Sequence, residues 1–370
     1  MSGLYIHIPF CKSKCPYCDF YSLPKSDENI EKYINSLTDE IQTHKRTAMF
    51  TQNFDFSFDT IYFGGGTPSV LSIFQIADIL DCIKANYIIS PNAEITMECN
   101  PSTIDRQYIK SLALLGINRI SLGLQSAVDN ERRSLGRLAD KNKVNQCIDL
   151  LRKYGINNIS LDVMLGVPCQ TLNSLKETVD FLIQSQVPHI SAYMLSIEEG
   201  TFFHRKQSTL NLPDEDTVCD MYSYLSAELS NNGFEHYEIS NFAKKGFESK
   251  HNTKYWECKE YLGLGPSAHS FIDGKRFFFD RSINSFINEY PAQFDDFGGD
   301  SDEFIMLGLR LNKGISNEEY KARFGCDIPK SVINKASQFQ ESNHLIIKNG
   351  NIALTEKGML ISNYIISNII

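Results

Sequence analysis

Three cysteines near the start of the chain have the spacing of metal ligands. Cys11, Cys15 and Cys18 fall within the eight-residue segment CKSKCPYC. Thiolates are the soft, anionic ligands that iron-sulfur clusters take, and a cubane [4Fe-4S] cluster is normally held by four of them. Because this motif offers only three, one iron keeps a position for a ligand that is not protein. The segment therefore predicts a [4Fe-4S] cluster with one open coordination site.

A zinc site and a disulfide framework are the alternatives for these cysteines. Zinc would need a fourth ligand, typically from a second paired set of Cys or His, and no such pair is obvious in the sequence. Disulfides are disfavoured because no signal peptide precedes Cys11, and thiols stay reduced in the cytosol. A cytoplasmic location is therefore expected.

The composition narrows the classes of function. A formal net charge of -9 and a pI near 5.5 argue against a general nucleic-acid binder, which would carry a basic face. The longest apolar runs, such as the one around Ile365, are too short to cross a bilayer. We therefore expect no nucleic-acid partner and no integral membrane segment, so that any membrane association is peripheral.

The elements that must position the cysteine loop form a run of β/α units. Short apolar stretches predict strands over residues 4–8, 60–63, 94–99, 119–123, 159–165 and 189–195. Amphipathic spacing predicts helices over residues 27–44, 73–85, 105–115, 141–154 and 173–184. Such alternation demands a parallel sheet, and six units predict an α/β fold with a partial, TIM-like (βα)6 barrel. This barrel is expected to occupy residues 1–200.

The pattern changes after residue 200. An intermediate region over 201–295 has a predicted helix at 214–231, a strand at 234–239 and a turn-rich stretch at 241–279 that ends in a hairpin at Asp273-Gly274. Residues 294–300 read as a linker. Residues 300–370 predict three helices, a hairpin turning at Asn349-Gly350 and a further helix. This is a winged-helix-like module, for which a packing or docking role is favoured over DNA binding.

Polar residues gather where the predicted strands end. In parallel barrels the active site lies at the carboxyl ends of the strands. Besides the cysteine loop, the residues at these ends are Gly64, Gly65, Gly66, Thr67, Glu98, Gln125 and Ser196. Asp162 lies inside an apolar strand, where a carboxylate is costly unless it is hydrogen-bonded. Arg137 follows Gly136 in a predicted loop. Taken singly, each of these residues is explained equally well without any functional site, as a plain loop residue, a solvated strand end or, for Arg137, a surface cation.

The C-x3-C-x2-C spacing resembles that of the radical S-adenosylmethionine (SAM) enzymes. In that family SAM binds the open iron of the cluster, and an electron donor reduces the cluster. The order and spacing of the rim residues resemble the oxygen-independent coproporphyrinogen dehydrogenase branch. The resemblance implies that Gly65, Gly66 and Thr67 approach the methionine amino group, that Gln125 and Asp162 hold ribose hydroxyls, and that Arg137 meets the methionine carboxylate. It also implies that Glu98, Tyr5 and, less directly, Ser196 complete the SAM pocket.

Two departures and one motif indicate the subgroup. The dehydrogenases have a further Cys two residues after the third ligand, where this chain has Phe20, and they have a longer segment before the cluster. The segment His251 to Trp256, HNTKYW, resembles the H-N-x-x-Y-W motif of the haem chaperones related to that branch. The resemblance implies a protein that binds haem, with His251 as a candidate ligand, and transfers it to haem-accepting proteins. A SAM-dependent oxidoreductase acting on a porphyrinogen and a regulatory protein using the C-terminal module are the alternatives.

Overall fold

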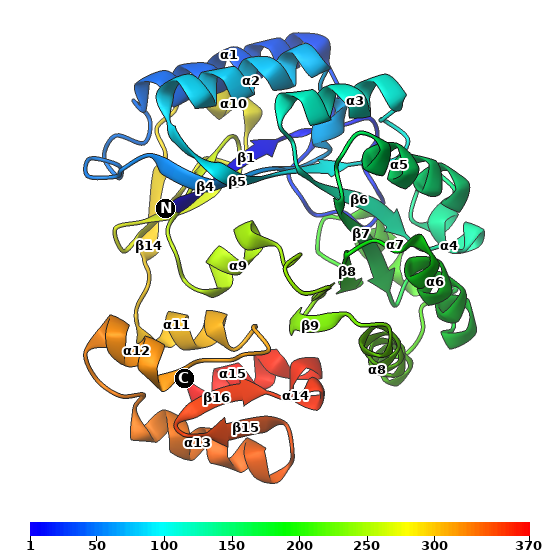
Figure 1. Ribbon diagram of the computed structural model, residues 1–370, viewed down its shortest axis with the longest axis vertical. Coiled ribbons are helices and arrows are strands. Elements are labelled where there is room, and N and C mark those ends of the chain that lie inside the picture. Colours follow the sequence, from blue (N-terminus) through cyan, green and yellow to red (C-terminus); the bar gives the residue numbers. More distant parts are fainter.

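A computed structural model describes residues 1–370, and its centre is a curved sheet of twelve strands (Figure 1). Six parallel strands lie side by side in chain order: β1 (Ser2–Ile8), β4 (Ser57–Gly65), β5 (Ile88–Cys99), β6 (Arg119–Gln125), β7 (Asn158–Leu165) and β8 (His189–Met194). The helices between them are α1 (Asp27–Thr43), α2 (Ile73–Asn86), α3 (Arg106–Leu115), α4 (Asp129–Ser134), α5 (Lys141–Lys153) and α6 (Leu172–Ser185). The predicted partial barrel of six β/α units is confirmed.

The sheet continues beyond the six units at both edges. At the β8 edge lie the antiparallel strands β10 (Asn241–Ala243) and β9 (Glu235–Glu238), which follow helix α8 (Glu215–Asn231). At the β1 edge lie β11 (Tyr261–Leu264), β12 (His269–Ile272), β13 (Lys275–Phe278) and β14 (Gln293–Phe297). The predicted hairpin at Asp273-Gly274 joins β12 and β13. The prediction of a linker from residue 294 is wrong, because β14 pairs with β13.

The helices that follow the strands begin at a capping side chain and bury an apolar stripe against the sheet. In α1 the Ser26 side chain accepts a hydrogen bond from the Asn29 N–H, which satisfies one of the free donors of the first turn. The apolar positions of the stripe are all buried against the sheet: Ile30, Tyr33, Ile34, Leu37 and Ile41. Helix α2 starts with a capping box between Ser72 and Gln75. These helices therefore cover the convex side of the sheet, as Figure 1 shows.

A short helix, α9 (Lys250–Trp256), lies on the concave side of the sheet, within a region predicted to be turn-rich (Figure 1). Its first turn is anchored to β5, because the Glu94 carboxylate accepts hydrogen bonds from the backbone N–H groups of Lys250 and His251. Lys254 forms an ion pair with Asp59 at 2.7 Å. The HNTKYW motif therefore forms a helix that is held against the concave side of the sheet, and not an open turn.

The C-terminal residues form a module with a core of its own. Its elements are α11 (Ser301–Gly308), α12 (Asn317–Phe324), α13 (Lys330–Glu341), β15 (Leu345–Lys348), β16 (Asn351–Leu354), α14 (Glu356–Leu360) and α15 (Ser362–Ile369). The predicted three helices and hairpin are confirmed, and the hairpin turns at Asn349-Gly350, where both residues have positive φ, but two short helices follow it instead of the one predicted. None of the helices in the structure has the length and apolar character needed to span a membrane.

Candidate functional site

The three cysteines of the motif lie on one loop at the carboxyl end of β1. Cys11 is buried in a two-residue strand, β2 (Phe10–Cys11), which pairs with β3 (Leu23–Pro24) and closes the loop. Cys15 and Cys18 are partly exposed, and all ten cysteines of the chain are free thiols. No three Cys, His, Asp or Glu side chains converge on a point where they could hold a single metal ion. A cubane cluster does not require such convergence, since each thiolate binds a different iron.

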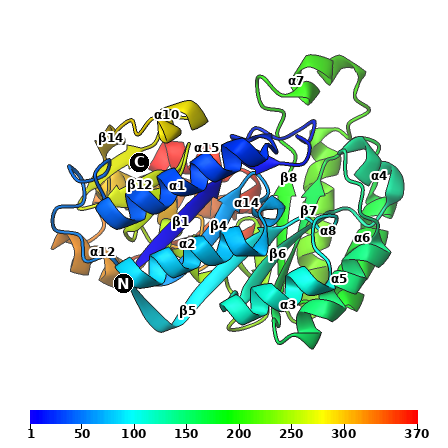
Figure 2. The same cartoon turned by 90° about the horizontal axis from the view of Figure 1, so that it is seen from above.

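Neighbouring loops hold the cysteine loop in place. Gly136, which has φ of 71°, packs so closely that a β-carbon there would lie 3.1 Å from Pro16 Cδ. The Pro16 carbonyl accepts a hydrogen bond from the Phe203 N–H in helix α7 (Phe202–Lys206) at 3.0 Å. Figure 2 shows α7 beside the dark blue loop that follows β1, at the end of the strands away from the N-terminus. The cysteine loop is therefore held by contacts from two other segments, the loop after α4 and helix α7.

The glycine turn after β4 packs directly against the first cysteine. The Gly66 N–H donates to the Ile8 carbonyl at 2.9 Å, and the Thr67 N–H donates to the Phe10 carbonyl at 2.8 Å. A β-carbon at Gly66 would lie 2.7 Å from the Phe10 carbonyl oxygen and 3.1 Å from Cys11 Sγ, so no other residue fits. The Thr67 hydroxyl lies 3.4 Å from Cys11 Sγ. The predicted glycine turn and the predicted cluster loop are therefore in direct contact.

Two carboxylates face the concave side of the sheet. Glu98 Oε1 accepts a hydrogen bond from the Tyr62 hydroxyl at 2.9 Å, and Asp162 accepts from the Ser121 hydroxyl at 2.8 and 3.0 Å. Burial raises the pKa of Glu98 to about 7, the nearby Asp162 carboxylate adds to that rise, and the Tyr62 hydrogen bond opposes it. Burial also raises the pKa of Asp162. Hydroxyl donors, rather than cations, therefore hold both acids in position.

Gln125 and Arg137 converge above Gly123 in β6. A β-carbon at Gly123 would lie 3.1 Å from Gln125 Nε2 and 3.5 Å from Arg137 Nη2. The same guanidinium donates to the Tyr17 hydroxyl of the cysteine loop at 3.0 Å. Arg137 Nε is buried and has no hydrogen-bond acceptor in the protein. A buried donor without an acceptor is costly, so this position suits an anionic group of a bound ligand.

Tyr5 is connected to the cysteine loop through His7. The His7 Nε2–H donates to the Tyr21 carbonyl at 2.9 Å, which makes Nδ1 the acceptor for the Tyr5 hydroxyl at 3.1 Å. Burial lowers the pKa of His7 to about 4, so the ring is neutral at neutral pH. The structure thus brings Tyr5 to the same end of the sheet as the cysteines.

Two of the predicted site residues, Ser196 and His251, do not join the residues gathered around the cysteine loop. Ser196 is exposed in the loop after β8, and its hydroxyl donates to Glu198 Oε1 at 2.6 Å. His251 is only 1% exposed, and both ring nitrogens are already hydrogen-bonded, Nδ1 to the Thr60 hydroxyl at 2.9 Å and Nε2 to the Tyr255 hydroxyl at 2.8 Å. This geometry offers no free nitrogen of His251 to haem iron.

The sequence analysis did not identify several side chains that form hydrogen bonds to the predicted site residues or lie beside them. Tyr62 and Ser121 lie two residues before Gly64 and Gly123, so strand alternation places each on the same face as its glycine. Tyr193 in β8 is 42% exposed and lies two residues after Ser191, whose hydroxyl is 3.1 Å from that of Ser160, so strand alternation places it on the concave side as well. A search for polar residues at alternate strand positions would have found them.

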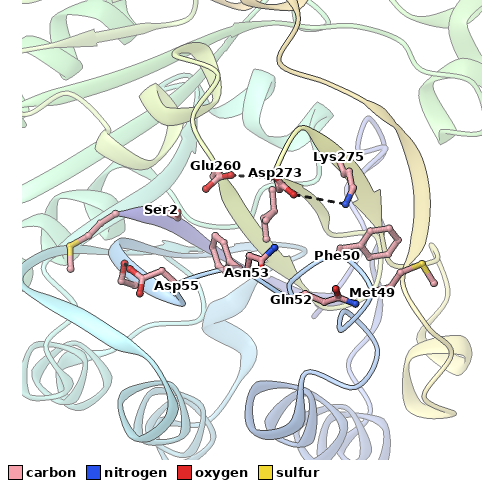
Figure 3. A pocket seen from close by; sticks show the side chains of 13 residues that line it. Ser2, Met49, Phe50, Gln52, Asn53, Asp55, Glu260, Asp273 and Lys275 are labelled. Atoms are coloured by element: carbon pink, nitrogen blue, oxygen red, sulfur yellow. Dashed lines mark hydrogen bonds and ion pairs between the residues drawn. The ribbon is translucent and has the colours of Figure 1, made fainter. Parts of the chain in front are cut away.

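A hollow of about 330 Å³ near the amino ends of β1 and β4 contains none of the predicted residues (Figure 3). Its wall includes Glu260, which accepts a hydrogen bond from the Asp273 N–H at 2.8 Å, and Lys275, whose Nζ lies 3.9 Å from the Asp273 carboxylate. Because none of the predicted residues lines it, and its acidic groups already have partners in the protein, this hollow is not the candidate site.

The raised pKa of Glu98 predicts a pH dependence of stability in the ligand-free protein. The folded state binds this proton more tightly than the unfolded chain, whose carboxyl has a pKa near 4.5. The contribution of Glu98 to the free energy of unfolding should therefore fall as pH rises from about 4.5 to about 7, by at most about 3 kcal/mol, and then level off, against an opposite trend from the buried neutral rings of His7 and His251. In Glu98→Gln this fall should be absent from urea unfolding curves, whereas the exposed-site variant Glu28→Gln should keep it. Parallel profiles for wild type and Glu98→Gln would contradict the assignment.

Comparisons with known proteins agree with this architecture. Residues 5–182 match the family model of the radical SAM superfamily, and residues 302–361 match that of the HemN C-terminal domain. A solved coproporphyrinogen III oxidase (HemN) from Escherichia coli superposes with a TM-score of 0.84 at 20% identity, covering 99% of this chain and 89% of that one. At this identity the likeness establishes the fold alone.

Sequence relatives cover almost the whole chain. The protein named heme chaperone HemW from Lactococcus lactis is 33% identical, covering 98% of this chain and 95% of its own length. The proteins of the same name from Haemophilus influenzae and Bacillus subtilis are 34% and 30% identical, each over 98% of this chain and 96% and 97% of their own lengths. The chain therefore belongs to the radical SAM superfamily and, within it, to the HemW family.

Proposed function

We propose that this protein is a cytoplasmic haem chaperone that binds a [4Fe-4S] cluster, SAM and haem and passes haem to acceptor proteins. The observation that carries the proposal is the similarity of nearly the whole chain to proteins named heme chaperone HemW. The geometry of the cysteine loop and of the concave interior supports the cofactor part of the proposal. The acceptor proteins and an electron donor for the cluster are its expected partners.

Cys11, Cys15 and Cys18 are the proposed protein ligands of the cluster. They lie on one loop that backbone hydrogen bonds and the Gly66 contact hold rigidly, which suits ligands that must keep a fixed arrangement. When bound, the cluster would supply a one-electron donor and one iron for SAM to occupy. The role of the protein is to hold the three thiolates and to keep the fourth position free of side chains.

The residues around the loop can recognise the polar parts of SAM. Backbone groups of Gly65, Gly66 and Thr67 border the cluster loop on one side. Arg137 Nε is a buried free donor suited to the methionine carboxylate, and Gln125 lies beside it. The remaining proposed contacts are Asp162 and Gln125 for the ribose hydroxyls, and Tyr5, Glu98 and Ser196 for the rest of the pocket.

A SAM-dependent oxidoreductase acting on a porphyrinogen is the second candidate, which the fold shared with the E. coli coproporphyrinogen oxidase favours. Against it stands Phe20, where the dehydrogenases have a further Cys. Its side chain is 69% exposed beside the cluster loop and makes only an apolar contribution there. The chaperone is therefore preferred.

Replacing Cys15 by Ala should abolish cluster binding, because it removes one of only three thiolates. Iron and sulfide analysis after anaerobic reconstitution measures the effect. The control is Cys82→Ala, which removes a half-buried thiol on α2 away from the loop and should leave the cluster content unchanged. A full complement of iron and sulfide in Cys15→Ala would reject the ligand assignment.

Asp162→Ala and Gln125→Ala should each weaken SAM binding while leaving iron and sulfide content unchanged. Loss of one hydrogen bond to a bound polar group costs about 1 to 3 kcal/mol, which corresponds to roughly tenfold to a hundredfold in affinity. Calorimetric titration of the reconstituted protein with SAM measures it, with Asp149→Ala on the exposed face of α5 as the control. Wild-type affinity in both site variants would rule out the ribose contacts.

Haem transfer and porphyrinogen turnover separate the two candidate functions. The reconstituted protein, loaded with haem, should pass it to an apo-haem protein. The same preparation, supplied with coproporphyrinogen III, SAM and a reductant, should form no decarboxylated product. Product formation without haem binding would instead establish the oxidoreductase.

A further inference from the structure

The chain has eight histidines, and most have no nitrogen to offer to a haem iron. Both ring nitrogens of His7, His189 and His251 are hydrogen-bonded inside the protein. His236 Nε2 contacts the Tyr222 hydroxyl and the Ile239 carbonyl. His44 Nδ1 has no hydrogen-bond partner but is fully buried, with the ring stacked on Phe56 at 4.0 Å between centroids. The histidines left are His204, His269 and His344.

His269 is the one of these three that lines a cavity beside the HNTKYW motif. The cavity has a volume of about 360 Å³, which is within the range of small-molecule sites. Its wall is formed largely by rings from β1, α9, β11 and β12: Tyr5, Tyr255, Trp256, Tyr261, His269 and Phe271. Tyr255 and Trp256 are the last two residues of the motif. The motif therefore faces this cavity through its aromatic end, whereas its histidine holds α9 against β4.

The surroundings of His269 suit an axial ligand. Its side chain is 57% exposed, makes no hydrogen bond within the protein, and has Nδ1 3.9 Å from the Asp295 carboxylate of β14. Histidines that bind metals usually direct their second nitrogen to a carboxylate, which fixes the tautomer and orients the ring.

Cationic and unpaired donor groups lie around the same cavity. Arg276 and Lys259 are part of its wall, although each is already ion-paired, Arg276 with Glu303 and Lys259 with Glu257. The Arg310 guanidinium stacks on the Trp256 ring with its carbon 4.3 Å from the ring centroid. The Trp256 indole N–H and Arg310 Nε are both buried without an acceptor in the protein. An entering carboxylate would satisfy such donors, so the cavity combines flat apolar walls with affinity for anionic groups.

We propose that haem, a flat aromatic macrocycle with an iron centre and two carboxylates, binds in this cavity and that His269 supplies the imidazole to its iron. The inference rests on the proposed chaperone function and assigns its cargo site. His251 is then a positioning residue, which keeps Tyr255 and Trp256 at the cavity through its bonds to Thr60 and Tyr255. The exposed edge of the cavity at His269 fits a cargo that must leave again.

Haem titration of the full-length, cluster-reconstituted protein tests the site. His269→Ala should shift the Soret band and weaken haem binding by about tenfold or more, and added free imidazole should restore the band. Asp295→Asn should weaken binding by about tenfold with the band retained, because the carboxylate, 3.9 Å from Nδ1 in this structure, would hold the ring only once the two side chains close that distance on haem binding. Fluorescence of Trp256, the only Trp in the chain, gives the affinity independently. The control, His344→Ala, alters a half-buried histidine of the C-terminal module and should change neither quantity.

The outcomes separate this site from the function on which it rests. Haem binding by wild type with an unchanged band and affinity in His269→Ala would overturn the cavity assignment and leave the chaperone proposal standing. A band shift in His251→Ala with none in His269→Ala would also overturn it. A wild-type protein that binds no haem would overturn the chaperone proposal itself. Iron and sulfide content and thermal unfolding, measured for each variant, should stay at wild-type values for His269→Ala.

Discussion

The close approach between the turn after β4 and the strand that carries Cys11 is the contact on which the site depends. Two backbone hydrogen bonds cross it, from Gly66 to Ile8 and from Thr67 to Phe10, and no β-carbon fits at Gly66. The distance between these backbones therefore cannot relax outward without losing both hydrogen bonds. It fixes the first thiol relative to the sheet, and the rest of the loop is then held by Gly136, Arg137 and Phe203.

The concave interior is neutral in most places despite its many ionisable groups. Burial lowers the pKa of His7 to about 4 and that of His251 to about 3, and raises that of Glu98 to about 7. Their hydrogen-bond partners are hydroxyls and backbone groups, which add no charge. Two arginines keep their charge: Arg119 lies 4.0 Å from the Glu94 carboxylate, whereas Arg137 has an incompletely paired guanidinium near the cysteine loop. The interior is thus arranged to attract a ligand with a negative group at one end.

The sequence predicted the parts of the fold that repeat a simple pattern. Apolar strands and amphipathic helices such as α1 lie within a few residues of the predicted limits. Cys11, Gly66, Glu98 and Gln125 lie at the strand ends where the β/α order places them, and Asp162 lies inside β7 as predicted. Helix α9 was missed because it has only seven residues and depends on Glu94, a partner more than 150 positions away. Strand β14 was missed because its five residues are all exposed, so no alternation marks it. The cavity at His269 was missed because its walls come from four separate elements.

Tyr5 belongs to two environments at once. Its ring is part of the wall of the aromatic cavity, and its hydroxyl is hydrogen-bonded to His7, which in turn holds the carbonyl of Tyr21 in the loop that carries Cys18. A ligand that moves the Tyr5 ring must therefore stretch or release a hydrogen bond that orders the cysteine loop. By thermodynamic linkage, a ligand of the loop that such a movement disfavours would weaken binding in the cavity by the same factor by which binding in the cavity weakens that ligand. Tyr5, His7 and the Tyr21 carbonyl would form the physical connection between the two proposed sites.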